Sequence, residues 1–159
     1  MPDGLYEHDA LAWAEQQAAL LRRLAAGEGG NDAVDWVNVI KEVQDVGLSE
    51  LRACESLLQQ AMVHLLRQFA RPDNWSVSQS EEAAGACLDH AVLRFAPSMH
   101  RRINLDELYA RARRRVVSAR DQSGDLRYLP LHCPFTIIGL LEGDTANLLG
   151  RIETAGGHA

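Results

Sequence analysis

Two polar side chains, Glu55 and His64, lie inside the most apolar stretch of the chain, from about residue 49 to 70. A carboxylate and an imidazole there could bind a metal ion or transfer a proton. On an α-helix, however, nine residues at ~100° each place them roughly 180° apart, so they cannot share one site. We expect His64 to flank the core and bond to a neighbouring carbonyl or carboxylate. We expect Glu55 to pair with an arginine or cap a backbone group, because a buried acid needs a partner.

His132 and Cys133 form the second candidate, in a connection that the sequence predicts to be extended. Zinc takes four ligands at recognisable spacings, which this pair does not provide. A Cys–His nucleophile needs a low thiol pKa and aimed geometry, and adjacent residues point apart. The chain also lacks the common zinc-protease, phosphate-loop, dinucleotide and nucleophile-elbow motifs. We therefore predict no catalytic residue, cofactor or metal, with a small metal-dependent or thiol hydrolase as an alternative.

Seven arginines lie between residues 101 and 120, where nucleic-acid binding is the chemistry to consider. On a helix from about 105 to 119, the arginines from 111 onward fall on both sides of the apolar stripe and on the back of the helix, so they make no single basic face. Arginine stems commonly lie along apolar surface, and these would also balance the acidic first fifty residues. A nucleic-acid-associated factor is kept as an alternative, with phosphate contacts from Arg101, Arg102, Arg111, Arg114 and Arg115.

The element that must position these groups is a helix over about 49–70. Its apolar residues recur at steps of three and four, as on one helix face: Leu51, Cys54, Leu58, Ala61, Met62, Leu65 and Phe69. Leu57 and Leu66 widen this stripe beyond that of an ordinary surface helix. We expect the other helices to pack around it.

Two helices are predicted before it. The first, from about 4 to 26, has two adjacent apolar sides. One consists of Tyr6, Ala10, Trp13, Gln17, Leu20 and Leu24, and the other of Leu11, Ala14, Ala18, Leu21 and Ala25. The second begins near Asp32 or Asp35 and is expected to end at Gly47 with a positive φ. This second predicted helix would then fold back on the central helix at a tight corner over 47–49.

The second half of the chain carries clear helix-start signals. Ser78 begins a capping box for a helix to about 95, and Asn104 can cap the helix from 105 to about 119. Residues 97–101 suit a short turn of helix, and Thr136 can start a short helix that Gly143 stops. The prediction is an all-α, single-domain bundle of about five main helices around the central one. It assigns 1–142 to the domain and 143–159 to an extension with a short helix and a frayed tail.

Composition fits this architecture: 159 residues, 47% hydrophobic and 24% charged, with a net charge of -6. That length suits one domain with a core of its own. The three widely spaced cysteines, Cys54, Cys87 and Cys133, favour reduced thiols over a disulfide framework. No apolar run reaches the ~20 residues of a membrane span, and the first residues lack a signal-peptide pattern. We expect a cytoplasmic protein with no membrane association.

The chain also resembles a known family over about residues 5–142. The resemblance is carried by Tyr6, Asp9 and Trp13, by Asp35-Trp36-Val37-Asn38, by Gly47-Leu48-Ser49-Glu50, by His64-Leu65-Leu66, by Trp75-Ser76 and Pro97-Ser98, and by Cys133-Pro134-Phe135-Thr136. These residues resemble the bacterial "domain of unknown function 29" family. The resemblance implies a small all-α protein and no established activity.

With no chemistry in evidence, we predict a non-enzymatic helical interaction module that binds a protein partner or forms a homo-oligomer. Apolar-rich helices and three tryptophans motivate this prediction. The interaction or pocket residues that it names are Trp36, Glu42, Glu55, His64 and Trp75.

Overall fold

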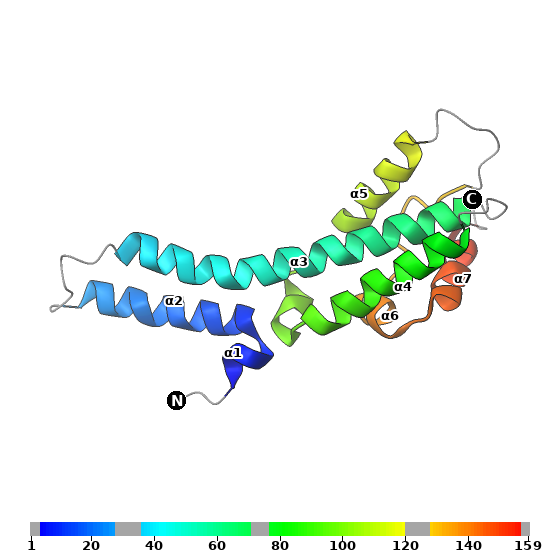
Figure 1. Ribbon diagram of the computed structural model, residues 1–159. Coiled ribbons are helices and arrows are strands. Elements are labelled where there is room, and N and C mark those ends of the chain that lie inside the picture. The colour runs from blue at the N-terminus through cyan, green and yellow to red at the C-terminus, as the bar shows by residue number, and fades with distance from the viewer. Residues whose placement is uncertain (1–3, 28–35, 71–76, 120–127, 157–159) are drawn as a thin grey trace. The chain divides into compact units, whose positions relative to one another are not determined.

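The computed structural model describes residues 4–27, 36–70, 77–119 and 128–156, with the side chains of residues 77 and 78 left aside. All regular elements in these ranges are helices, so the predicted all-α fold is confirmed (Figure 1). The chain divides into two compact units. Unit 1 contains residues 1–53 and 94–103, and unit 2 contains residues 54–93 and 104–159. The predicted division at 142/143 stays a prediction.

The first predicted helix is two helices, α1 (Leu5–His8) and α2 (Ala10–Ala26). The break is at Asp9, whose φ of -153° and ψ of 80° are not helical. Its carboxylate accepts a hydrogen bond from the Ala12 backbone N–H at 2.9 Å and so caps α2. The same carboxylate accepts from the Ser98 N–H at 3.0 Å and the Ser98 hydroxyl at 2.7 Å. Asp9 thereby joins α2 to η1 (Pro97–Arg101), the short helical turn that the sequence predicted.

Helix α3 (Trp36–Ala70) is continuous, so the predicted corner at Gly47-Leu48-Ser49 is wrong. Gly47 has no positive φ; among the described glycines only Gly4 does. Gly47 is instead a contact surface for α2. A β-carbon built on it would lie 2.8 Å from the Leu11 Cα and 3.0 Å from the Ala14 Cβ. The absence of a side chain lets two helices approach closely, which is the other common reason for a helical glycine.

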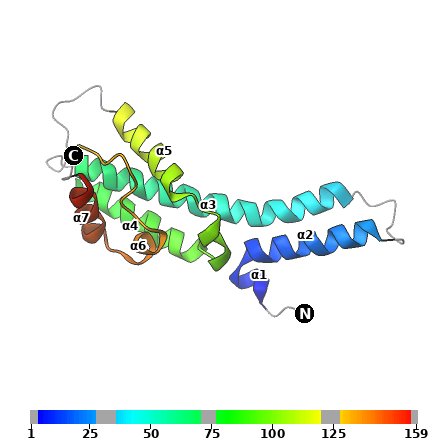
Figure 2. The same cartoon turned by 180° about the vertical axis from the view of Figure 1, so that it is seen from behind.

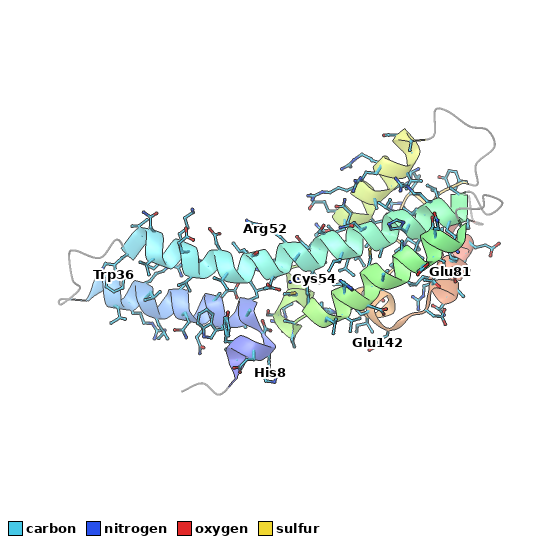
Figure 3. The ribbon with its side chains drawn as sticks, in the orientation of Figure 1. His8, Trp36, Arg52, Cys54, Glu81 and Glu142 are labelled. Atoms are coloured by element: carbon cyan, nitrogen blue, oxygen red, sulfur yellow. The ribbon has the colours of Figure 1, made fainter. Side chains whose placement is uncertain are left out.

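Unit 1 contains a hairpin in which α2 lies alongside the N-terminal half of α3, as both views show (Figure 2). The two helices of the hairpin bury a small core between them: Leu11, Ala14, Ala18, Gly47 and Leu51. Trp36, in the first turn of α3, is half-buried (Figure 3). Between 19 and 27 and between 36 and 46, none of the described residues is buried. The far end of the hairpin therefore has no core of its own.

Unit 2 is built around the C-terminal half of α3. Its fully buried side chains include the predicted apolar stripe: Cys54, Leu58, Ala61, Met62 and Leu65. Helix α4 (Val77–Arg94) lies alongside (Figures 1 and 2), and the Cys54 thiol donates to the Ala91 carbonyl at 3.9 Å. Helix α4 begins at Val77, one residue before Ser78. The capping role of the Ser78 side chain stays a prediction.

The rest of unit 2 closes this core. Helix α5 (Leu105–Ser118) is capped by Asn104, whose side chain accepts from the Glu107 N–H, as predicted. Helix α6 (Ile137–Glu142) is capped by Thr136 through the Gly139 N–H, also as predicted. Helix α7 (Thr145–Gly156) is longer than expected, because Leu148 and Ile152 are buried and anchor it. Among the described residues, each helix is too short or too polar to be a candidate membrane span.

Candidate interaction surface

The predicted pocket residues lie at separate places along the chain. Glu42 is exposed and Trp36 half-buried in unit 1, and Glu55 and His64 are half-buried on the part of α3 that belongs to unit 2. Trp75 lies outside the described residues. The roughly 180° separation of Glu55 and His64 follows from their positions on one continuous helix. Their roles remain predictions.

His64 has a lowered pKa, first because burial penalises its charged form and second because Arg67 places a positive charge nearby. A neutral imidazole is therefore favoured near pH 7. The predicted hydrogen bond from His64 to a carbonyl or carboxylate stays a prediction. His64 is therefore a half-buried side chain at the margin of the core that favours its neutral form.

Cys133 is half-buried, and its thiol donates to the Phe135 carbonyl at 3.7 Å, while His132 is exposed. Burial raises the pKa of the Cys133 thiol to about 11. A nucleophilic cysteine needs the reverse shift, because the thiolate is the reactive form. In the part of the chain that the structure describes, no group of three or more His, Cys, Asp or Glu side chains is placed to hold a metal ion.

The five arginines named for phosphate contacts are all exposed. Two of them are in ion pairs within their own units. Arg102 lies 2.7 Å from Glu15 in unit 1, and Arg111 pairs with Glu107 one turn earlier in α5. Arg101 belongs to unit 1, and Arg114 and Arg115 belong to α5 in unit 2. The nucleic-acid role remains a prediction.

A shallow groove of about 390 Å³ lies between α6 and α7 in unit 2. Its lining includes Gly139, Glu142, Gly143, Asp144 and Arg151. Asp144 caps α7 through the Asn147 N–H at 2.7 Å, and Arg151 donates to the Asn147 side chain at 3.1 Å. Two polar residues of this groove, Thr136 and Asp144, therefore cap the helices that form it.

A more extensive feature is the apolar side of α2 that the hairpin leaves uncovered. Helix α2 turns its Leu11–Ala14–Ala18 side toward Gly47 and buries it. Its other apolar side, rotated by roughly 120°, stays at the surface, with Leu20 44% and Leu24 60% exposed. Trp13 begins this side, and its ring packs edge-to-face on Tyr6 with centroids 4.8 Å apart. We call Trp13, Gln17, Leu20 and Leu24 the α2 stripe; their steps of four, three and four match a coiled-coil seam.

Helix α3 carries a matching set, Val39, Val43 and Val46, which we call the α3 stripe. Val39 is 38% and Val46 41% exposed, and Val43 is half-buried. The stripe is rotated by roughly 85° from the side of α3 that faces α2. Glu50, one step further, ends the apolar series by pairing with Arg94 at 2.9 Å.

The two stripes lie on the same side of the hairpin. On each helix, a turn in the same direction about the helix's own N-to-C axis leads from the side that contacts the other helix to the stripe. Because the two helices are antiparallel and their contact sides face each other, both stripes then point to the same side of the hairpin. The approach of Gly47 to Leu11 and Ala14 fixes the height of one helix against the other. Trp13 is therefore level with Val46, Gln17 with Val43, and Leu20 with Val39. Together the two stripes form one surface, the hairpin face.

The hairpin face contains no charged residue, whereas the opposite side of the hairpin is charged. Glu15 pairs there with Arg102, and Lys41 lies 3.8 Å from Asp45. This asymmetry distinguishes the face from scattered apolar residues, which are normal on protein surfaces.

Comparison with known proteins places the chain in a family. The family model described as "Domain of unknown function DUF29" matches residues 5–145. The chain belongs to the DUF29 family. This confirms the resemblance carried by the motifs from Tyr6 to Thr136. A search of curated proteins found no significant match to this DUF29 chain.

Among solved structures, this DUF29 chain is similar to an alpha-helical protein of unknown function from Rhodospirillum rubrum. The two are 24% identical, with a TM-score of 0.80. The match covers 92% of this chain and 96% of the other. This similarity supports the fold and carries no activity with it.

Sequence reasoning did not select Leu20, Leu24, Val39 and Val46 as candidate surface residues. The signal was present for α2, where the sequence shows two adjacent apolar sides. Only one of them can face a single neighbouring helix. For α3, the wrong prediction that a helix ends at Gly47 prevented the selection of Val39 and Val46. A helix that ended there would have packed differently against the central one.

Proposed function

We propose that this DUF29 protein is a non-enzymatic helical interaction module that binds a helical protein partner through the hairpin face, in the cytoplasm. The observation that carries the proposal is the exposure of four large apolar side chains on α2 and α3, Leu20, Leu24, Val39 and Val46. The register given by the contact of Gly47 with Leu11 supports their placement on one face. The named residues of the site are Trp13, Leu20, Leu24, Val39 and Val46.

The angles between helix sides support a helical partner. In a four-helix bundle each helix contacts two neighbours, so it needs two apolar sides roughly at right angles. Helices α2 and α3 each have two apolar sides, separated by roughly 120° on α2 and roughly 85° on α3. Within the hairpin each helix satisfies one side only. Two further helices laid on the hairpin face would complete a bundle.

The chemistry of the polar candidates also favours binding over catalysis. Burial raises the pKa of Cys133 to about 11, which opposes a thiolate nucleophile near neutral pH. The pKa of His64 is lowered, first by burial and then by the positive charge of Arg67. Apolar anchors surrounded by polar residues are typical of interaction surfaces.

Site-specific photocrosslinking in the cells that naturally make the protein would test this proposal. A photoreactive amino acid at Leu24 should give a discrete adduct, because that side chain would contact the partner. The matched control is position Val37, which is 77% exposed on the other side of α3. Adduct formation at Leu24 should disappear when Val46→Glu is added. Equal labelling at both positions, or no adduct at Leu24, would refute the proposed function.

A further inference from the structure

The partner itself can be inferred from the hairpin face, an inference that rests on the proposed function. We propose that the hairpin face binds the same face of a second copy of this chain, so that two hairpins form a four-helix bundle. Helix α2 of one copy lies over α3 of the other, and the two copies are related by a twofold axis parallel to the helices.

The sizes of the side chains support this arrangement. The α2 stripe carries the large residues Trp13, Leu20 and Leu24, and the α3 stripe carries only valines. A twofold axis parallel to the helices leaves the position of each residue along the axis unchanged. It places α2 of one copy opposite α3 of the other. Leu20 of one copy then lies over Val39 of the partner subunit, and Trp13 lies over Val46 of the partner subunit. At these two levels a large residue meets a small one, as close packing requires.

Helix direction supports it as well. Because α2 and α3 are antiparallel, this twofold axis makes every pair of neighbouring helices in the bundle antiparallel. Such a contact is self-complementary, since residue i meets residue j and j meets i. The pairing Leu20 with Val39 therefore occurs twice, as does the pairing Trp13 with Val46.

Charge permits self-association at this surface. The chain carries a net charge of -6, so two copies repel one another over most surfaces. The stripes contain no charged residue and include one polar residue, Gln17, whose amide can both donate and accept hydrogen bonds. Glu15 and the Lys41–Asp45 pair lie on the opposite side of the hairpin, away from the proposed contact.

The area sets the expected strength. The 17 residues of α2 span about 25 Å, and two adjacent helices are about 20 Å wide, so each copy offers about 500 Å². The total of about 1,000 Å² is at the lower end of specific interfaces. We therefore expect a reversible dimer that dissociates on dilution.

Sedimentation velocity of the full chain tests this inference, over a concentration range from about 1 to 200 µM because dimerisation follows mass action. The wild type should shift from monomer to dimer. Leu20→Glu should raise the dissociation constant about 100-fold or more, because a carboxylate would be buried unpaired. Val37→Glu, a control on the same hairpin outside the face, should leave it unchanged. Circular dichroism checks that both variants keep their helices, which is expected because both positions are exposed.

A cross-linking experiment tests the geometry. Leu20→Cys chains mixed with Val39→Cys chains should form a disulfide between the two variants, identified by peptide mapping. Leu20→Cys alone should not link to itself. Self-linking of Leu20→Cys would overturn the pairing of α2 with α3.

The outcomes separate this inference from the proposed function. A wild-type chain that stays monomeric over the whole range overturns the dimer. If Leu24 then still gives a discrete adduct with a different protein, the proposed function stands and only the identity of the partner is wrong. If the adduct at Leu24 contains two copies of this chain, both are supported.

Discussion

Gly47 of α3 lies so close to Leu11 of α2 that a β-carbon on Gly47 would be 2.8 Å from the Leu11 Cα. The obstacle is backbone, which cannot rotate away. Gly47→Ala should therefore force the two helices apart and destabilise the protein by about 1–3 kcal/mol, in the range of overpacked cores. This outweighs the about 0.5–1 kcal/mol that alanine gains over glycine within a helix. Chemical denaturation would measure the difference.

Gly85 of α4 provides the control for that substitution. A β-carbon there would meet nothing within 4 Å. Gly85→Ala should accordingly stabilise the protein by about 0.5–1 kcal/mol, from helix propensity alone. If both glycine variants changed stability in the same direction, close approach would not be the reason for Gly47.

Asp9 should make the protein less stable in acid. Burial raises the pKa of its carboxyl, but hydrogen bonds from Ala12 and Ser98 outweigh this and hold the pKa below the usual 3.8. Because the folded-state pKa is the lower one, its stabilisation is present above about pH 4 and is lost as pH falls through the folded-state pKa. Asp9→Asn should cost about 1–2 kcal/mol at neutral pH and little in strong acid. Unfolding free energies measured against pH would show the two curves converging; parallel curves would contradict the assignment.

Ser98→Ala tests the same link from the other side. It removes the hydroxyl that donates to Asp9 at 2.7 Å and leaves the capping bond from Ala12 in place. We expect a loss of about 1 kcal/mol and an upward shift of the Asp9 pKa. An NMR titration of the Asp9 carboxyl would follow that shift, and an unchanged pKa would show that Ser98 does not stabilise the charge.

Tyr109 ties α5 to the segment before α6. Its buried hydroxyl donates to the Pro130 carbonyl at 2.8 Å, and burial raises its pKa well above the usual value. Tyr109→Phe keeps the ring contact with Phe135 but leaves the Pro130 carbonyl without its hydrogen-bond donor. The expected cost is about 1–3 kcal/mol. Thermal unfolding would measure it, and a neutral result would indicate that water replaces the hydroxyl.

Cys133 should react slowly with alkylating reagents. At about pH 8, a thiol with a pKa of about 11 is ionised in about one molecule in a thousand. Iodoacetamide should therefore modify Cys133 about 100-fold more slowly in the folded protein than in urea, because only the thiolate reacts. Mass spectrometry of the Cys133 peptide over time would give both rates. Equal rates would restore the thiol hydrolase as a candidate.

Several elements were predictable because their cause is local. The period of 3.6 residues over 105–118 predicted α5, and Asn104 and Thr136 predicted the starts of α5 and α6. A capping side chain and the backbone N–H that it satisfies lie three residues apart, so the sequence contains both. The buried stripe from Cys54 to Leu65 was predictable for the same reason, since its spacing alone defines a wide apolar side.

The break at Asp9 and the continuity of α3 depend on residues far apart in the chain. Asp9 is held by Ser98, 89 positions later. Gly47 can end a helix or admit a neighbouring one, and only the presence of Leu11 against it decides which.

The spacing of apolar residues along the chain is enough to predict that it is helical, where its apolar stripes lie, and that two of them share α2. Which of those two stripes is buried depends on the fold, because a helix in a hairpin has one neighbour and can cover one side. The packing of Gly47 on Leu11 covers the side with Ala14 and Ala18 and leaves Leu20 and Leu24 at the surface, where a partner can reach them.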